Sequence, residues 1–274
     1  MSDALFRLDG KVAVVTGSLG LLGKEHLRAL GRAGARLVVT DLSDEGSQAF
    51  ASELSGMGHE ALGQGADVTR KADLERLLEA ALSRFGRIDV LVNNAALDEK
   101  VEAKGGSSLA EASRFENLSV EVFRRALDVN VTGVFLASQV FGTKMAEQGS
   151  GSIVNIASTY GLVAPDQSLY RARDGTQLFY KSAAYPTTKG AVLQLTRYLA
   201  AYWGERGVRV NALCPGGVSN GQGEDFVASY SRRTPLGKMA DRTDYHGAVV
   251  YMASDASRYM TGATLVVDGG FTAW

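Results

Sequence analysis

The chain has 274 residues, of which 45% are hydrophobic and 22% are charged, the proportions of an ordinary globular protein with a sizeable core. Its 29 Lys+Arg against 30 Asp+Glu give a formal net charge of -1, and no basic run interrupts this balance. Composition therefore gives no indication of a nucleic-acid or anionic-membrane partner, and we expect a small-molecule substrate.

The single cysteine and the N-terminal residues indicate in which cellular compartment the protein is expected. Cys214 can form no internal disulfide, and with 3 scattered histidines it makes no zinc-ligand spacing, so we expect a buried thiol and no metal site. The opening residues lack the apolar core of a signal peptide, and no apolar run is long enough to span a bilayer. We therefore expect a cytoplasmic protein without a membrane-spanning segment.

Short runs rich in β-branched residues alternate with segments of helical periodicity along nearly the whole chain. Strands are expected at residues 11–17, 35–41, 87–94, 151–158, 208–215 and 263–270. Helices are expected at 21–34, 71–85, 119–147 and 184–206, and through "DYHGAVVYMASD". This alternation predicts a Rossmann-like α/β fold, a doubly wound and mostly parallel sheet with helices on both faces. No linker or internal repeat divides the series, so residues 1–274 are expected to form a single domain.

Two polar stretches, 97–119 and 166–184, break this alternation. Long irregular segments in a small domain are usually binding loops or lids. We therefore expect both to be insertions at the rim of the active site.

Glycines at positions 17, 20 and 23 follow the first expected strand and precede a long helix, in "VVTGSLGLLGKEH". A glycine-rich turn there lets the backbone approach a pyrophosphate, which then lies against N–H groups at the positive end of the helix dipole. For the glycines alone, the alternative is a tight turn without a ligand.

Asp41 ends the second expected strand, where a carboxylate can accept hydrogen bonds from both ribose hydroxyls of an adenosine. A 2′-phosphate there would meet a like charge, and the turn from Gly17 to Gly23 offers no Lys or Arg to offset it. NAD is therefore favoured over NADP. The alternative is that Asp41 caps a helix beginning near Ser43 or Asp44.

Tyr185 and Lys189 stand at positions i and i+4 of an expected helix and project from one face. Pro186 fits only in the first turn of that helix, which places the tyrosine at the helix start. A nearby ammonium is expected to lower the tyrosine pKa from about 10, which makes the phenol an acid/base for an alcohol or a carbonyl. On its own, such a pair would more often be an ordinary exposed one.

These motifs, taken with further segments in chain order, resemble the short-chain dehydrogenase/reductase family in its single-domain, NAD(P)-dependent branch. The matching segments are "TGSLGLLG", "DVT" at 67–69, "NNAA" at 93–96, "LDVNVTGVF" at 127–135, "IVNIAS" at 153–158, "YPTTK" at 185–189, "NALCPGGV" at 211–218 and "SDASRYMTGATLVVDGG" near the end. The resemblance implies an NAD-binding catalytic domain that transfers a hydride between a secondary alcohol and a dinucleotide.

The resemblance also assigns catalytic roles residue by residue. Tyr185 matches the family's acid/base, and Lys189 matches the residue that holds the nicotinamide ribose and lowers the tyrosine pKa. Ser158 matches the hydroxyl that orients the substrate oxygen, and Asn130 matches the anchor of a proton-relay water. As alternatives, Ser158 could satisfy a strand end and Asn130 could kink its helix.

Further residues match the family's contacts with the dinucleotide. Asp67 and Val68 match the adenine contacts, Asn94 a support after the fourth strand, and 215–218 the cover of the nicotinamide. The expected set is Gly17, Gly20, Leu22, Gly23, Asp41, Leu42, Asp67, Val68, Asn94, Ala95, Tyr185, Lys189, Pro215, Gly216, Val218 and Asn220.

Three features depart from the family pattern. Leu21 stands where the glycine turn usually has Gly, and Asn220 stands where a cofactor-binding threonine is common, although asparagine can also hydrogen-bond a carboxamide. The third is the insertion at 166–184 between Ser158 and Tyr185, which must leave and return at the active-site rim.

The insertion bears on the substrate because it carries Arg171 and Arg173, and guanidinium groups suit carboxylates, phosphates and sugar hydroxyls. Together with the ending "DGGFTAW", it is similar to insertions of carbohydrate-acting family members, so we expect a sugar, a sugar acid or a polyol. The expected substrate residues are Ser158, Tyr160, Arg171, Arg173 and Tyr185. The alternative is a solvated lid or a subunit contact.

Two other functions stay open at this point: an NADPH-dependent ketoreductase of lipid or polyketide intermediates, and a non-catalytic dinucleotide-binding regulator. Asp41 argues against the first, and the intact pair Tyr185 and Lys189 argues against the second. The resemblance also implies a homo-oligomer, a dimer or a tetramer, in which Trp274 lines a partner's pocket or an interface. Burial of Trp274 within its own chain is the alternative.

Overall fold

Helices and strands alternate through the computed structural model, which describes residues 3–98 and 108–274. The α-helices are α1 (Asp3–Phe6), α2 (Leu21–Arg32), α3 (Asp44–Gly56), α4 (Lys71–Phe85), α5 (Leu109–Ala112), α6 (Val120–Leu127), α7 (Gly133–Gln148), α8 (Ala184–Trp203), α9 (Glu224–Arg233) and α10 (His246–Ala253). The strands are β1 (Val12–Thr16), β2 (Arg36–Thr40), β3 (Ala61–Gly63), β4 (Val90–Asn93), β5 (Gly151–Ile156), β6 (Val208–Pro215) and β7 (Thr264–Val267). Residues 99–107, within the expected insertion at 97–119, lie outside the described residues.

The strands form one parallel sheet of 7 strands in the order β3-β2-β1-β4-β5-β6-β7. At its centre β1 pairs with both β2 and β4, so that Val14 lies beside Val38 and Leu91. The strand order changes direction between β1 and β4, which is the switch point of a doubly wound fold. The expected fold class is confirmed. The sequence does not predict β3, because its 3 residues are too few to show a period.

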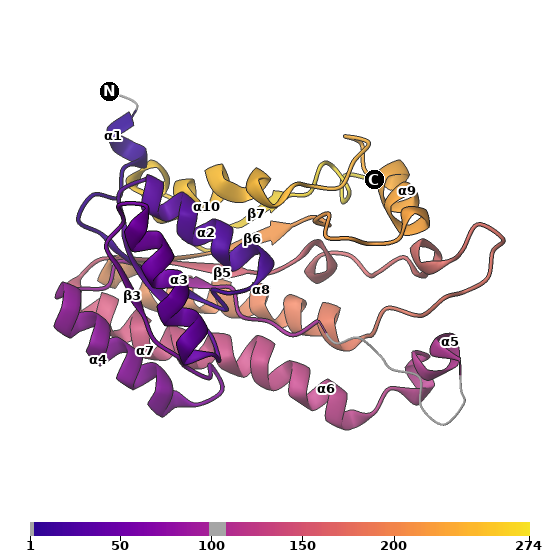
Figure 1. Ribbon diagram of the computed structural model, residues 1–274, viewed down its shortest axis with the longest axis horizontal. Helices are drawn as coiled ribbons and strands as arrows, with labels where there is room; N and C mark the ends of the chain where they lie inside the picture. Colours follow the sequence, from indigo (N-terminus) through magenta and orange to yellow (C-terminus); the bar gives the residue numbers. More distant parts are fainter. Residues whose placement is uncertain (1–2, 99–107) are drawn as a thin grey trace.

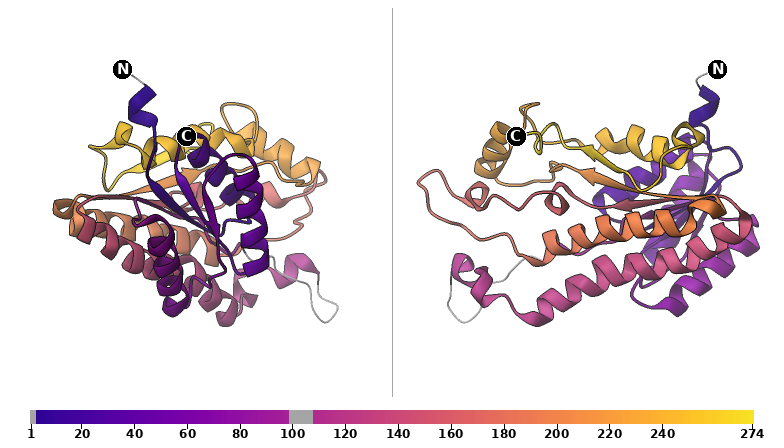
Figure 2. Two further views of the ribbon diagram at one scale, coloured as in Figure 1. Left: turned by 60° about the vertical axis from the view of Figure 1, so that its left-hand side comes forward. Right: turned by 180° about the vertical axis from the view of Figure 1, so that it is seen from behind.

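Alternate residues of β1 face opposite sides of the sheet, and each side is covered by its own helices. Val12 and Val14 lie in an apolar core with side chains of α4, α7 and α8. Ala13 and Val15 lie in a second core with side chains of α2, α3 and α10. Figure 1 shows these helix layers on either side of the sheet, and Figure 2 shows them from two further directions. Both faces of the sheet are therefore buried, as a parallel sheet requires.

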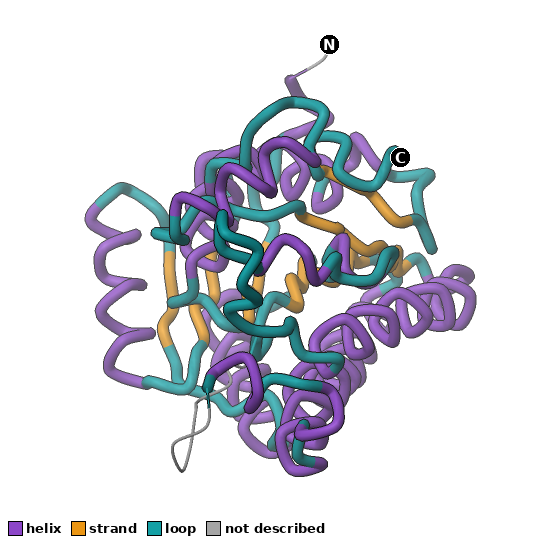
Figure 3. The backbone as a smooth tube through the Cα atoms, turned by 90° about the vertical axis from the view of Figure 1, so that its right-hand side faces the viewer, coloured by secondary structure: helices purple, strands orange, loops and turns teal. Residues whose placement is uncertain are grey.

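The carboxyl ends of the strands meet at one edge of the sheet because the strands are parallel. The insertion at 166–184 and helix α9 extend beyond that edge, on the right of Figure 1, and Figure 3 looks onto it. The insertion contains a 3-10 turn, Gln167–Tyr170, and its Leu169 and Tyr170 are buried in a cluster with Tyr230 of α9. The insertion is therefore a packed wall at this edge.

The helix expected at 119–147 is present, but its winding changes midway. A π-helical turn, Asp128–Thr132, joins α6 to α7 and carries the fully buried Asn130. Such turns within α-helices are frequent at functional sites.

Helix α8 begins one residue before Tyr185, so Tyr185 and Pro186 lie in its first turn as the sequence predicts. Further along, Val192, Leu199 and Trp203 are buried and Leu195 is partly buried, so this side of the helix belongs to the core.

Two expectations concern the chain as a whole. Cys214 is fully buried near the end of β6, as expected. Within the described residues, no helix combines the length and the apolar character that crossing a bilayer needs.

Gly142 of α7 packs directly against Trp203 of α8, and a Cβ built on Gly142 would lie 2.4 Å from a carbon of the indole ring. We expect Gly142→Ala to lower the free energy of unfolding by about 1–3 kcal/mol, because overpacking a buried ring forces neighbours to shift. Urea unfolding followed by tryptophan fluorescence measures this. Gly204→Ala, with nothing within 4 Å of its Cβ, is the matched control and should change stability little. Equal stability of the two variants would contradict this packing.

Candidate active site

A cleft of about 1330 Å³ lies at the carboxyl edge of the sheet. Its walls come from the glycine turn, the ends of β2, β4, β5 and β6, the start of α8 and the insertion at 166–184. Sites for single small molecules usually measure about 300–1,000 Å³, so this cleft has room for a dinucleotide and a substrate together. The expected site residues that line it are Gly17, Gly20, Leu22, Asp41, Leu42, Asp67, Val68, Asn94, Ala95, Ser158, Tyr160, Arg171, Tyr185, Lys189, Pro215, Gly216, Val218 and Asn220.

The glycine turn is packed so closely that side chains are excluded from it. Gly17 has a φ of +62°, and a Cβ there would lie 2.7 Å from the Cα of Ala95. A Cβ on Gly23 would lie 2.2 Å from the Gly17 carbonyl oxygen, so Gly23 shapes the turn from behind and does not line the cleft. Gly20 precedes α2 and gives its first N–H groups no side-chain cap. Bare backbone with uncapped N–H groups fits an anionic pyrophosphate.

The Asp41 carboxylate is fixed by backbone groups on both sides. Its two oxygens accept hydrogen bonds from the N–H groups of Leu19 at 3.0 Å and Leu42 at 2.8 Å. Helix α3 is capped by Ser43, whose hydroxyl accepts from the Gly46 N–H, so the alternative that Asp41 is the cap is excluded. Asp41 thus ties the end of β2 to the glycine turn and keeps lone pairs for ligand hydroxyls.

Asn94 holds the glycine turn against the end of β4. Its side-chain amide donates to the carbonyl oxygens of Thr16 and Gly17, both at 2.9 Å. Its backbone N–H donates to the Thr16 hydroxyl at 3.1 Å. The two strand ends that flank the switch point are therefore locked together.

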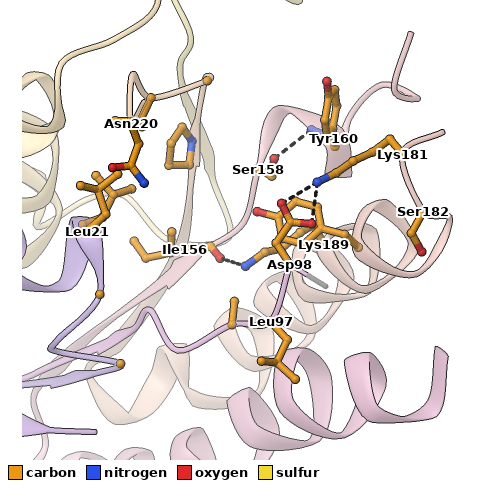
Figure 4. A pocket seen from close by; sticks show the side chains of 18 of the residues that line it. Leu21, Leu97, Asp98, Ile156, Ser158, Tyr160, Lys181, Ser182, Lys189 and Asn220 are labelled. Carbon is orange, nitrogen blue, oxygen red and sulfur yellow. Dashed lines mark hydrogen bonds and ion pairs between the residues drawn. The ribbon is translucent and has the colours of Figure 1, made fainter. Parts of the chain in front are cut away.

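Ser158, Tyr185 and Lys189 line the other end of the cleft, part of which Figure 4 shows from close by. The Lys189 ammonium donates to the Ile156 carbonyl at 2.7 Å and lies 5.5 Å from the centre of the Tyr185 ring. The Ser158 hydroxyl accepts a hydrogen bond from the Tyr160 N–H at 3.1 Å. Since Lys189 is only 3% exposed, the alternative of an ordinary exposed pair is excluded.

The Tyr185 phenol does not have the lowered pKa that the sequence predicts. Burial raises its pKa, the charge of Asp98 raises it further, and the hydroxyl of Ser158 acts in the opposite direction. Burial also lowers the pKa of Lys189 to about 8, because the ammonium loses solvation. The prediction of a lowered Tyr185 pKa is wrong because the Lys189 ammonium hydrogen-bonds the Ile156 carbonyl. Its attraction for a phenolate therefore does not outweigh the cost of burying that charge.

Asn130 is buried next to the cleft without lining it. Its side-chain oxygen accepts from the Leu97 N–H at 2.7 Å, and its amide donates to the Leu97 carbonyl at 2.9 Å and to the Thr188 hydroxyl at 3.0 Å. The side chain therefore clamps the segment after β4 to helix α8. The relay water expected at Asn130 stays a prediction.

The structure separates the two arginines expected to bind substrate. Arg171 lines the cleft and donates to the Gln177 side chain at 2.9 Å. Arg173 does not line the cleft: it is exposed and forms an ion pair with Asp225 of α9. The expectation for Arg173 is therefore corrected, because its guanidinium is turned outward to a partner on α9.

Three polar groups that line the cleft are not among the substrate residues expected from the sequence. Asp98 and Lys181 both line the cleft and form an ion pair with each other. Tyr170 also lines it, with its hydroxyl 3.0 Å from that of Tyr160 and its ring stacked on Phe226 at 5.4 Å. The usable signal was position, since Asp98 follows the "NNAA" motif and Lys181 precedes Tyr185 at the end of the insertion.

Trp274 is neither buried nor in the cleft. Its ring is 76% exposed, and its indole N–H donates to the Arg233 carbonyl at 3.0 Å. Burial within its own chain is therefore excluded. Among the described residues, no cluster of three or more His, Cys, Asp or Glu side chains could hold a metal ion.

The known proteins to which this chain is similar are reductases and dehydrogenases. The sequence model described as enoyl-(acyl carrier protein) reductase matches residues 22–272. The chain is 37% identical over 275 residues to a D-threitol dehydrogenase of Mycolicibacterium smegmatis, with 98% of this chain and 96% of that protein covered. It is 37% identical over 267 residues to a 3-alpha-(or 20-beta)-hydroxysteroid dehydrogenase of Mycobacterium tuberculosis, with 97% and 91% covered.

A solved structure is similar as well. The crystal structure of a gluconate 5-dehydrogenase from Burkholderia cenocepacia, in complex with NADP and tartrate, matches with a TM-score of 0.87. Its sequence is 30% identical, and the match covers 100% of both chains. Sequence and fold thus agree over the whole length.

The placement of the phenol predicts the effect of Tyr185→Phe. This change removes the hydroxyl that can exchange a proton and keeps the ring that packs at the start of α8. We expect turnover to fall at least about 100-fold, the usual contribution of an acid/base group, with dinucleotide affinity nearly unchanged. Steady-state kinetics and fluorescence titration with NADH measure the two effects. Retained turnover would show that another group moves the proton.

Proposed function

The chain belongs to the short-chain dehydrogenase/reductase family and is an oxidoreductase. From this membership we propose that it interconverts a secondary alcohol of a sugar or polyol and the corresponding ketone with NAD. The observation that carries the proposal is that Ser158, Tyr185 and Lys189 share one cleft with the glycine turn and Asp41. The glycine turn, Asp41 and Lys189 would hold a dinucleotide along this cleft, and the dinucleotide would supply the hydride acceptor.

The chain's own side chains manage the proton. Ser158 orients the alcohol oxygen, and the phenolate of Tyr185 accepts the hydroxyl proton. The hydrogen on the carbon that bears this hydroxyl would leave as a hydride to the dinucleotide, so that a ketone forms. In the reverse direction the proton returns from Tyr185 to the ketone oxygen. Because burial raises the pKa of Tyr185, its basic form becomes more populated as the pH rises, and alcohol oxidation should accelerate toward alkaline pH.

The choice of NAD follows from the fixed carboxylate of Asp41. The carboxylate lines the cleft beside Leu42, held in place by two backbone N–H groups. A 2′-phosphate at this point would meet a charge that cannot turn away. The related gluconate 5-dehydrogenase holds NADP, so the proposal of NAD for this chain rests on Asp41 and not on that relative.

The proposed substrate class combines the lining of the cleft with the relatives. Polar groups of Asp98, Tyr160, Arg171 and Lys181 line the part of the cleft that the insertion bounds. Hydroxyl-rich molecules suit such a lining because each hydroxyl both donates and accepts a hydrogen bond. D-threitol and gluconate, in the names of two relatives, are molecules of this kind.

A hydroxysteroid or another bulky apolar alcohol is the second candidate. The observation that favours it is the aromatic wall, in which Tyr170 lies against Phe179 at 4.7 Å and Phe226 at 5.4 Å. One relative carries such a substrate in its name. The wall is not purely apolar, because the hydroxyl groups of Tyr160 and Tyr170 lie next to each other at its edge.

We also infer a cytoplasmic homo-oligomer. Tyr198 and Tyr202 on α8 are 61% and 56% exposed, and their rings stack at 6.0 Å. Exposed aromatic side chains on a helix suit contact with a second copy of the chain. The buried single Cys214 is in keeping with a reducing compartment.

Asp41→Asn tests the cofactor. The change removes the charge and keeps one acceptor oxygen, enough for one of the two backbone N–H groups. We expect the ratio of kcat/KM for NAD to that for NADP to fall about tenfold or more, a change of about 1.4 kcal/mol. Asp9→Asn, which removes an exposed acid paired with Arg7 far from the cleft, is the control and should not change the ratio. An unchanged ratio for Asp41→Asn would remove its role in cofactor choice.

A panel of alcohols with NAD and with NADP tests the substrate class. It contains threitol, galactitol, gluconate, 2,3-butanediol, 2-butanol and a 3α-hydroxysteroid, and NADH or NADPH formation is measured at 340 nm. We expect turnover of polyols with NAD. Turnover confined to the steroid would establish the second candidate, and no turnover of any alcohol would overturn the proposal.

A further inference from the structure

An ion pair crosses the cleft directly beside the candidate acid/base. Asp98, on the segment after β4, pairs with Lys181, at the returning end of the insertion (Figure 4). The Lys181 ammonium lies 5.2 Å from the centre of the Tyr185 ring. Side chains 83 positions apart in sequence therefore meet in the part of the cleft that holds the Tyr185 ring.

Side-chain amides hydrogen-bond the backbone of the residue before Asp98 and the backbone of Lys181 itself. Asn130 hydrogen-bonds both the N–H and the carbonyl of Leu97, the neighbour of Asp98. Gln167 does the same for Lys181, accepting from its N–H at 2.8 Å and donating to its carbonyl at 3.2 Å. Such clamps hold a binding group in place before the ligand arrives.

Each cation of the insertion already has a polar partner. Arg171 donates to Gln177, Arg173 pairs with Asp225, and Lys181 pairs with Asp98. The Asp98 side chain is 50% exposed, whereas the Lys181 side chain is 16% exposed. The group beside Tyr185 is thus a neutral pair with an accessible carboxylate.

We propose that Asp98 and Lys181 bind a second hydroxyl of the substrate, on a carbon close to the one that is oxidised, and so select neutral vicinal polyols. This inference rests on the proposed function and narrows it. A hydroxyl has one donor and two acceptor sites, so it can donate to the Asp98 carboxylate and accept from the Lys181 ammonium at once. Hydrogen bonds to charged groups are the stronger kind.

The same pair disfavours a carboxylate at this position. A carboxylate has no proton to donate to Asp98, and it would meet that like charge at close range. Burial is the main reason why the pKa of Tyr160, Tyr170 and Tyr185 is raised, and the charge of Asp98 adds to it; the same charge opposes the lowering of the Lys189 pKa by burial. A sugar acid is therefore accepted only if its carboxylate lies away from the pair.

The test compares two alcohols that differ only in the second hydroxyl, 2,3-butanediol and 2-butanol, in the full-length enzyme. Lys181→Met keeps the length of the side chain and removes its charge and donors. Asp98→Asn removes the acid's charge and is the second variant. Lys144→Met, which breaks an exposed ion pair with Glu147 on α7, is the matched control. Thermal melting and NADH titration establish that each variant folds and binds the dinucleotide.

We expect Lys181→Met to lower kcat/KM for the diol at least tenfold more than for 2-butanol, because a site built for a hydroxyl loses discrimination when its donor is removed. Asp98→Asn should lower the ratio of diol to gluconate turnover by tenfold or more. Lys144→Met should leave both ratios unchanged.

Two results overturn the inference while the proposed function stands. Equal losses for the diol and 2-butanol would mean that the pair only supports Tyr185, and no loss for either would mean that the pair does not touch the substrate. If the unaltered enzyme oxidised no polyol with either dinucleotide, the proposed function itself would fail.

Discussion

All strands of the sheet run in one direction, and this constraint determines where the chemistry can be. Parallel strands bring their carboxyl ends to one edge, so residues from β1, β2, β4, β5 and β6 converge there although long helices separate them in sequence. The reversal of strand order between β1 and β4 opens the edge at its centre. Asn94 closes the resulting gap with hydrogen bonds to Thr16 and Gly17, so the floor of the cleft is rigid.

The parts that the sequence predicts are those in which one residue type satisfies a local requirement. Glycine at position 17 is needed for a positive φ, and glycine at 23 is needed because a Cβ would meet the Gly17 carbonyl. Pro186 is tolerated only in a first helical turn, which correctly places Tyr185 at the start of α8. Such rules act over a few residues and can therefore be read without a structure.

The parts that the sequence does not predict depend on partners that are distant along the chain. Nothing local distinguishes Arg171, which lines the cleft, from Arg173, which turns to Asp225 on α9. The pairing of Asp98 with Lys181 likewise requires the insertion to fold back, which it does by packing aromatic side chains against α9. The pKa of Tyr185 is a further case, because it is set by burial, which spacing alone does not reveal.

The charges around Tyr185 explain how a buried phenol can still serve as a base. The ammonium groups of Lys181 and Lys189 lie 5.2 Å and 5.5 Å from the centre of its ring, and Asp98 balances one of them. With a neutral phenol the group carries one net positive charge, whereas with a phenolate it is neutral. Burial favours the phenol, and the unbalanced ammonium favours the phenolate, so the two effects oppose each other. Because Asp98 shifts that balance and also offers its carboxylate to the cleft, a hydroxyl bound there would couple substrate recognition to proton transfer.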